Sequence, residues 1–254
     1  MVITATLPVV LRGRCLAWAN RPGCVTKSSS LRIAIDGPAA AGKTTVARAT
    51  AHRLGILYLD TGAMYRTLAC LALRAGTDAD NGAALARLMQ TSPIAVELDE
   101  SAQLGFRIFA GGHELDETTL SSNEVTAIVS TVAAQPQVRT EMVSAQRRIA
   151  HDAPVVMAGR DIGTVVLPDA PVKIYLTASI PARIERRRRQ LQAAGFEVDA
   201  HRLAQEIEER DRLDQSRAIS PLAPAPDAHI IDSSEIDAER VVDEICAVVA
   251  AASP

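Results

Sequence analysis

One stretch near the start of the chain constrains the fold more than any other. Residues 31–36 are a short apolar run with β-branched side chains, and residues 37–45 match the pattern G-x-x-x-x-G-K-[ST] without substitution. The next residues, 46–49, favour a helix. Because this pattern binds phosphate where it joins a strand to a helix, the stretch predicts an α/β fold with a parallel sheet and an anion-binding loop.

The chemistry of this loop assigns a role to each kind of residue in it. Gly37 and Gly42 let the backbone approach an anion, while the loop N–H groups and the helix N-terminus direct positive partial charge toward it. Lys43 would reach the β- and γ-phosphates of a nucleoside triphosphate, and the Thr44 hydroxyl would bind Mg²⁺. The triphosphate-binding residues are expected to be Gly37, Pro38, Ala39, Ala40, Ala41, Gly42, Lys43, Thr44 and Thr45.

The bulk properties exclude several classes of protein. The chain has 254 residues, 48% of them hydrophobic, which is enough to bury one substantial core. Its net charge of −3 argues against a general nucleic-acid binder. The four cysteines form no C-x-x-C pair, which is typical of a reducing cytoplasm. No apolar run approaches the roughly 20 residues of a membrane span.

The first 30 residues differ from the rest of the chain. Residues 2–11 are mildly apolar, but arginines follow this segment instead of preceding it, which is the reverse of a secretory signal. Three serines, 28–30, then lead into the first strand. We expect residues 1–30 to be a mobile extension and residues 31–254 to form the folded domain.

Further short apolar runs extend the predicted parallel sheet. Together with residues 31–36 they make five strands, and segments with helical periodicity separate them. The additional strands are expected at residues 56–60, 154–158, 172–177 and 228–232. Because ligands of such sheets bind at the carboxyl ends of the strands, the residues that follow each strand are the candidates for a binding site.

A different pattern occupies residues 92–131. The segments 94–98 and 106–109 alternate apolar and polar side chains, which predicts a small antiparallel sheet inserted into the parallel core. A helix is expected to open at Ser121, where Ser121 and Glu124 have the spacing of a capping box.

Charged residues gather on two of the predicted helices. A helix is expected from Asp199 to about Leu213, with a stripe that begins apolar and becomes charged. The members of this stripe, at i, i+4, i+7, i+11 and i+14, are Leu203, Ile207, Arg210, Asp214 and Arg217. This stripe favours contact with a polar ligand if the helix continues that far. The alternative is a surface ion pair between Arg210 and Asp214. The arginine run 186–189 has two interpretations, a solvated face or a ligand contact.

The supply of arginine near the predicted ligand edge suits a phosphorylated acceptor, because guanidinium groups bind phosphate in a bidentate way. A phosphate acceptor, with a second pKa of about 6, is already ionised at pH 7 and needs no general base. A sugar-type acceptor would need a positioned carboxylate, and Asp36, Asp60 or Asp161 could serve. The chain has no N-K-x-D and no D-x-x-G, so a GTPase switch is not expected.

Several segments together resemble bacterial cytidylate kinase over about residues 31 to 250. The segments that carry this similarity are 37–45, 59–66, 130–133 with Arg139, 159–166, and 210–212 with Asp214, Arg217 and 221–222. The resemblance implies a P-loop kinase fold with a parallel five-stranded sheet flanked by helices, a small antiparallel monophosphate-binding insert at about 92–131 and a helical lid at about 180–197. It also implies ATP-dependent phosphorylation of CMP and dCMP with Mg²⁺. From the residues themselves we expect a cytoplasmic protein with no nucleic-acid or membrane partner, and nothing in the sequence demands more than a monomer.

By this resemblance, nine polar residues would bind CMP. They are Ser130, Arg139 and Asp161 for the cytosine, Arg66 and Arg160 for the monophosphate, Asp214 and Arg210 for the ribose, and Thr61 and Arg217 elsewhere in the acceptor site. The resemblance further implies that lid arginines close over the γ-phosphate. The catalytic set would then comprise Lys43, Arg160, Arg183, Arg187 and Arg188.

The chain departs from the family pattern at Ala158, where many relatives carry an acidic residue that could hold a Mg²⁺-bound water. Asp36 or Asp60 is the expected substitute. Two alternatives to the CMP kinase stay open at this point: a P-loop kinase for another small acceptor, such as a different monophosphate or shikimate, and a nucleotide-binding regulator that has lost turnover.

Overall fold

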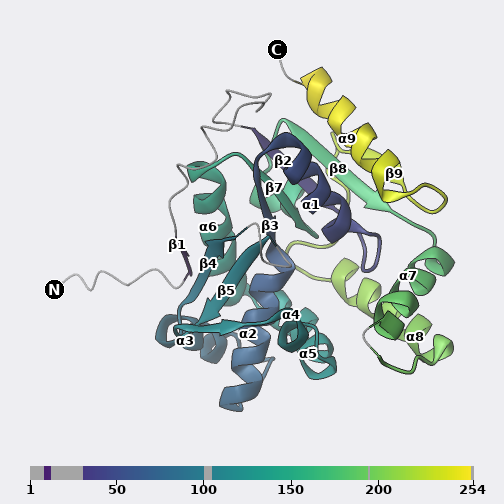
Figure 1. Ribbon diagram of the computed structural model, residues 1–254. Coiled ribbons are helices and arrows are strands. Elements are labelled where there is room, and N and C mark those ends of the chain that lie inside the picture. The colour runs from purple at the N-terminus through teal and green to yellow at the C-terminus, as the bar shows by residue number, and fades with distance from the viewer. Residues whose placement is uncertain (1–8, 13–30, 100–104, 194, 253–254) are drawn as a thin grey trace. The chain divides into compact units, whose positions relative to one another are not determined.

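The computed structural model describes residues 9–12, 31–99, 105–193 and 195–252 (Figure 1). The chain divides into two compact units. The first consists of Met1–Ser30 and Leu57–Pro154, and the second of Leu31–Ile56 and Val155–Pro254. Of the expected N-terminal extension, only residues 9–12 are described, and they form a strand. For residues 1–8 and 13–30 the predicted mobility lies outside the described residues.

The larger sheet has five strands in the order β3-β7-β2-β8-β9. They are β3 (Leu57–Asp60), β7 (Val155–Gly159), β2 (Arg32–Asp36), β8 (Val172–Thr177) and β9 (His229–Asp232). The pairs β2–β7, β2–β8 and β8–β9 are parallel. Continuous apolar runs form β2 and β7 because these inner strands are buried on both faces, as the central strands of a parallel sheet are. The predicted five-stranded core is therefore confirmed.

Four helices and one short π-helical turn complete the second unit. They are α1 (Lys43–Leu54), η2 (Ile162–Val166), α7 (Ile180–Ala193), α8 (Ala200–Gln215) and α9 (Ala238–Ala252). Helices α1 and α9 pack against each other, with α1 on β7 and β2 and α9 on β8. Helices α7 and α8 contact each other, and η2 contacts β2 and β7. The phosphate-loop sequence thus joins β2 to α1, as predicted.

The first unit contains a smaller sheet and the remaining helices. The helices are α2 (Thr61–Ala75), α3 (Gly82–Thr91), α4 (Glu117–Leu120), α5 (Asn123–Ala134) and α6 (Pro136–Asp152). The strands are β4 (Ile94–Leu98), β5 (Phe106–Ala110) and β6 (His113–Leu115), paired antiparallel, with β1 (Val9–Arg12) parallel to β4. The expected antiparallel pair is confirmed, while β6 and β1 were not predicted.

One local prediction is wrong. The N-cap of α5 is Ser122, whose Oγ accepts from the Val125 N–H at 3.3 Å, because Ser121 instead ends α4 and donates from its Oγ to the Glu117 carbonyl at 2.6 Å. The capping box with Glu124 is therefore absent from α5. The helix expected from Asp199 to about Leu213 is confirmed as α8, which ends at Gln215, so Arg217 follows the helix.

Candidate functional site

The phosphate loop has a backbone that only certain residues can adopt. Gly37 has φ +151°, and a Cβ placed on it would lie 2.0 Å from the carbonyl oxygen of Leu176 on β8. Gly42, the N-cap of α1, has φ +94°. Ala40 also has positive φ, +57°. The loop therefore needs glycine at position 37 for close approach to β8 and at position 42 for the left-handed turn into α1.

Lys43 and Thr44 occupy the first turn of α1. The Lys43 side chain folds back along the loop, and its Nζ donates to the Pro38 carbonyl at 2.6 Å, which leaves the residue 8% exposed. Thr44 is an exposed residue. A hydroxyl oxygen on this turn fits the hard-oxygen preference of Mg²⁺, and the loop fits the phosphates that would share that ion.

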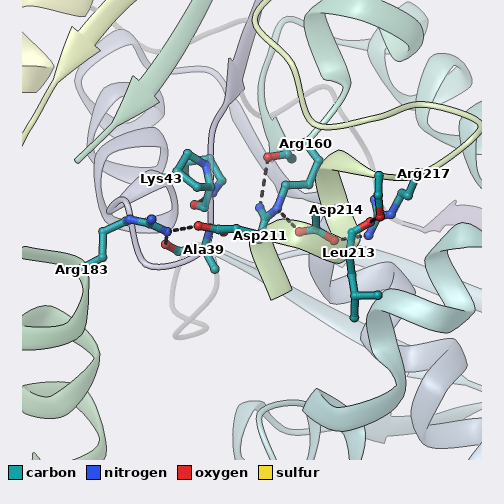
Figure 2. A network of polar contacts seen from close by, with 11 residues as sticks. Ala39, Lys43, Arg160, Arg183, Asp211, Leu213, Asp214 and Arg217 are labelled. Carbon is teal, nitrogen blue, oxygen red and sulfur yellow. Dashed lines mark hydrogen bonds and ion pairs between the residues drawn. The ribbon is translucent and has the colours of Figure 1, made fainter. Parts of the chain in front are cut away.

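Arg183 of α7 lies directly on the phosphate loop (Figure 2). Its Nη1 donates to the Ala39 carbonyl at 3.1 Å and its Nε to the Ala178 carbonyl at 3.1 Å. The same guanidinium forms an ion pair with Asp211 of α8, whose other oxygen accepts from the Ala39 N–H at 3.2 Å. One arginine and one carboxylate therefore hold both polar groups of the Ala39 residue.

Arg186, the first member of the arginine run, also reaches the loop. Its Nη1 donates to the Ala41 carbonyl at 3.2 Å and to Ser233 Oγ at 3.0 Å, and its Nη2 donates to the Ser233 carbonyl. Residues three apart share a helix face, so the spacing of Arg183 and Arg186 was the available signal. The arginine run is thus neither wholly solvated nor wholly at the ligand site.

The two other arginines expected to close over the γ-phosphate have different surroundings. Arg188 forms a bidentate pair with Glu185 at 2.7 and 2.8 Å on the same helix. Arg187 is half-buried, and burial lowers the pKa of its guanidinium while the charge of Glu206 on α8 opposes that shift. Arg187 Nη1 donates to Gln190 Oε1 at 3.5 Å, so hydrogen bonds to residues of α7 are formed by both arginines.

Asp36, the last residue of β2, ties this strand to the segment that follows β7. Its two carboxylate oxygens accept from the backbone N–H groups of Ile162 and Gly163 at 2.8 and 2.7 Å. Burial raises the pKa of Asp36 to about 6, although both amides favour the ionised form. Asp60, the other expected substitute for an acid at position 158, caps α2 by accepting from the Gly62 N–H at 2.8 Å.

Asp214 is the centre of a second cluster in this unit. Arg160 Nε donates to its Oδ2 at 2.8 Å, and Arg217 Nη2 donates to its Oδ1. The Asp214 side chain is only 2% exposed. Burial would raise its pKa, but the positive charges of Arg160, Arg217 and Arg210 outweigh burial and the pKa lies below its usual value. Figure 2 shows Asp214 between Arg160 and Arg217.

The stripe predicted on α8 is confirmed in its buried part. Leu203, Ile207 and Asp214 are all buried, so the charged end of the stripe does face inward. Arg210 contributes its charge to Asp214, and Arg217 joins the cluster from the loop after the helix. Asp161 is likewise buried, at the N-cap of η2.

The first unit holds the four other predicted CMP residues. Arg66 of α2 donates from Nη1 to the Leu120 carbonyl and to Thr126 Oγ1, both at 3.1 Å. The Arg139 guanidinium lies 5.8 Å from the centroid of the Tyr65 ring, and its Nη1 donates to the Ala133 carbonyl at 3.2 Å. The remaining two, Thr61 and Ser130, are buried.

The predicted residues therefore fall into two groups, one in each unit. The second unit holds the phosphate loop with Arg183 bonded to it. It also holds the cluster of Arg160, Asp214 and Arg217, while the first unit holds Thr61, Arg66, Ser130 and Arg139. Sequence reasoning missed Thr126, and it gave no individual role to Arg186 of the arginine run or to Asp211 of the segment 210–212. Buried guanidinium groups that carry charge beside a phosphate loop can neutralise a polyanion and position it.

In residues 9–12, 31–99, 105–193 and 195–252, no helix combines the length and the apolar character needed to cross a bilayer. The same residues contain no group of three or more His, Cys, Asp or Glu arranged to hold a metal ion.

Comparisons with known proteins agree on one family. The family model described as cytidylate kinase matches residues 33–251. The cytidylate kinase of Pelotomaculum thermopropionicum is 50% identical over 219 residues, which are 86% of this chain and 96% of that protein. The cytidylate kinase of a Geobacillus species is 47% identical over 221 residues, covering 87% and 97%. Among solved structures, an uncharacterized protein from Eubacterium ventriosum has a TM-score of 0.50 at 13% identity and covers 87% of this chain and 99% of its own, a likeness of fold alone.

Proposed function

This chain belongs to the cytidylate kinase family, and from that premise we propose that it transfers the γ-phosphoryl group of ATP to the phosphate of CMP and dCMP. The products are ADP with CDP or dCDP. The observation that carries the proposal, beside the family, is a complete phosphate loop with Arg183 bonded to its backbone. A kinase for another acceptor and a regulator without turnover are not favoured.

The chain's own residues supply positioning and charge neutralisation. An oxygen of the acceptor phosphate attacks the γ-phosphorus in line, and the bond to the β,γ-bridging oxygen breaks. No general base is needed, because the acceptor phosphate, with a second pKa of about 6, is ionised at pH 7. The guanidinium and ammonium groups that offset the repulsion between the two anions are Lys43, Arg160, Arg183, Arg187 and Arg188.

Mg²⁺ is proposed as the cofactor, held by the Thr44 hydroxyl together with the phosphates of ATP, and it would withdraw charge from the transferred group. The exposed Thr44 side chain on the first turn of α1 supports this assignment. The carboxylates of Asp36 and Asp60 each accept from backbone amides, so a role for either in the outer metal shell would add to a structural role.

The acceptor residues are proposed by their chemistry. Arg66 and Arg160 bind the monophosphate, since a guanidinium binds phosphate through two parallel hydrogen bonds. Asp214 and Arg210 hold the ribose. The cytosine is read by Ser130, Arg139 and Asp161, and Thr61 and Arg217 complete the CMP site. The buried, ionised state of Asp214 supports a role as a hydrogen-bond acceptor for sugar hydroxyls.

The organisation of the enzyme is proposed on the same premise. Residues 92–131 form the monophosphate-binding insert, and residues 180–197 form a lid that carries Arg183, Arg187 and Arg188. We propose a monomer that works in the cytoplasm on free nucleotides. The described cysteines, Cys70 and Cys246, are free thiols, which is compatible with a reducing compartment.

A coupled assay of ADP release tests the function across CMP, dCMP, UMP, AMP, dTMP and shikimate. We expect kcat/KM for CMP and dCMP to exceed that for every other acceptor by more than about tenfold, as expected for a site built to pair with the polar groups of one base. Preference for a different acceptor contradicts the assignment of cytosine. Binding of ATP without turnover on any acceptor would instead identify a regulator.

A further inference from the structure

Asp211 of α8 occupies a position on the phosphate loop that a ligand would be expected to take. Its Oδ1 accepts from the Ala39 N–H at 3.2 Å, and its Oδ2 pairs with Arg183 (Figure 2). The ion pair is largely removed from solvent, with side-chain exposures of 6% for Arg183 and 13% for Asp211. A carboxylate therefore bonds to an amide of the loop and to the nearest arginine at once.

These are the two interactions that a triphosphate needs from this part of the loop. The backbone N–H groups of such a loop bind phosphate oxygens, and an adjacent arginine neutralises their charge. While Asp211 holds both groups, the amide is satisfied and the arginine charge is compensated. A phosphate group placed beside Ala39 would also meet the carboxylate charge at short range in a site with little solvent screening.

We propose that Asp211 is an internal competitor of the triphosphate: it occupies the Ala39 amide and Arg183 when the loop holds no ligand, and it is displaced when polyphosphate binds. A polyphosphate displaces one carboxylate because it carries several charges and more acceptor oxygens. On displacement, Arg183 changes its partner from Asp211 to the phosphate. This inference rests on the proposed triphosphate site, but it does not depend on which acceptor nucleotide is used.

The first test measures the binding of inorganic tripolyphosphate and of ATP to the full chain by calorimetry. For Asp211→Asn we expect the Kd of both to fall by about five- to tenfold, because the competing charge is removed while the side-chain volume is kept. Glu209→Gln is the matched control. It removes one negative charge from the same helix, where Glu209 is exposed and paired with Arg212, and its Kd should change by less than about twofold. An unchanged or higher Kd for Asp211→Asn overturns the proposal.

The second test uses the unmodified protein, so it does not depend on the folding of a variant. In a crystal structure with tripolyphosphate, we expect a phosphate oxygen on the Ala39 N–H, with Asp211 moved away from it. A structure with tripolyphosphate in the loop and Asp211 still bonded to Ala39 overturns the proposal. The acceptor assay separates this inference from the proposed function, since loss of CMP preference would leave these two results unaffected.

Discussion

Arg160 and Asp214 are 54 positions apart in the chain, yet Arg160 Nε donates a 2.8 Å hydrogen bond to Asp214 Oδ2. Arg160 follows β7, and Asp214 lies near the end of α8. The same arginine donates from Nη1 to the Gly159 carbonyl at 3.2 Å, so two of its nitrogen atoms are held by the protein. Arg217 holds the other oxygen of Asp214. The orientation of the Arg160 guanidinium is thus set by the protein before any substrate binds.

This arrangement predicts that Arg160→Lys loses most activity although it keeps the charge. An ammonium group has no planar fork, so it cannot bond Asp214 and a phosphate in the same geometry. We expect kcat/KM for CMP to fall by about 100-fold, from the loss of one or two charge-assisted hydrogen bonds. Arg202→Lys, on the exposed face of α8, is the control and should behave as wild type. Near-normal turnover of Arg160→Lys would show that Arg160 has a structural role and not a catalytic one.

Asp36 predicts a particular dependence of stability on pH. Its pKa is raised by burial to about 6 in the folded protein, against about 4 in an unfolded chain. Between these values the folded state binds more protons than the unfolded state, so the free energy of unfolding from this group decreases as pH rises from about 4 to about 6. The decrease should be about 2 to 3 kcal/mol.

Chemical denaturation at several pH values between about 4 and about 7 measures this effect. Asp36→Asn has no such titration, so its stability should lack this component even though the variant is less stable overall from the loss of an amide bond. Parallel curves for the variant and the wild type would show that Asp36 does not titrate in this range.

The phosphate loop predicts unequal effects of adding a methyl group to two glycines. Gly37→Ala would place a Cβ 2.0 Å from the Leu176 carbonyl oxygen, so the loop must move away from β8. We expect a loss of at least about 3 kcal/mol of stability and no measurable ATP binding. Gly112→Ala also has positive φ, +87°, but meets nothing within 4 Å and should lose only about 1 kcal/mol. Similar losses at both sites would contradict the close-approach argument.

Removal of the Arg186 side chain is expected to weaken the binding of ATP and not that of CMP. Its contacts with the Ala41 carbonyl and Ser233 hold the phosphate loop to the segment after β9. For Arg186→Ala we expect KM for ATP to rise by about tenfold with little change in KM for CMP. Arg189→Ala is the control, because Arg189 is exposed and forms an ion pair with Glu185 on the same helix. An equal rise in both KM values would contradict a role of Arg186 that is confined to the ATP site.

Replacement of Thr126 is expected to affect the binding of CMP and not that of ATP. Its Oγ1 accepts from Arg66 Nη1 at 3.1 Å, and replacement by valine keeps the shape but removes the acceptor. We expect Thr126→Val to raise KM for CMP by about three- to tenfold and to leave KM for ATP unchanged. Thr140→Val, at an exposed position of α6 where the hydroxyl donates to the Pro136 carbonyl at 3.1 Å, serves for comparison. If KM for CMP does not change, the hydrogen bond from Arg66 to Thr126 does not position Arg66 for CMP binding.

Sequence alone determined the features whose cause is local. The phosphate loop was predictable because the glycines, Lys43 and Thr44 lie within nine consecutive residues whose conformation follows from their own backbone preferences. The inner strands were predictable because burial on both faces requires an unbroken apolar run. The inward face of α8 followed from helical spacing, since Leu203, Ile207 and Asp214 recur at the period of the helix.

Tertiary structure decided which of several similar residues takes each role. Ser122 caps α5 because the preceding short helix α4 uses Ser121 at its own end. Within the arginine run, Arg186 reaches the phosphate loop, where Ser233 also accepts from it. Arg188 instead pairs with Glu185 of its own helix. Asp211 meets Ala39 from 172 positions away. Such contacts depend on the packing of distant segments, which periodicity and motif spacing do not encode.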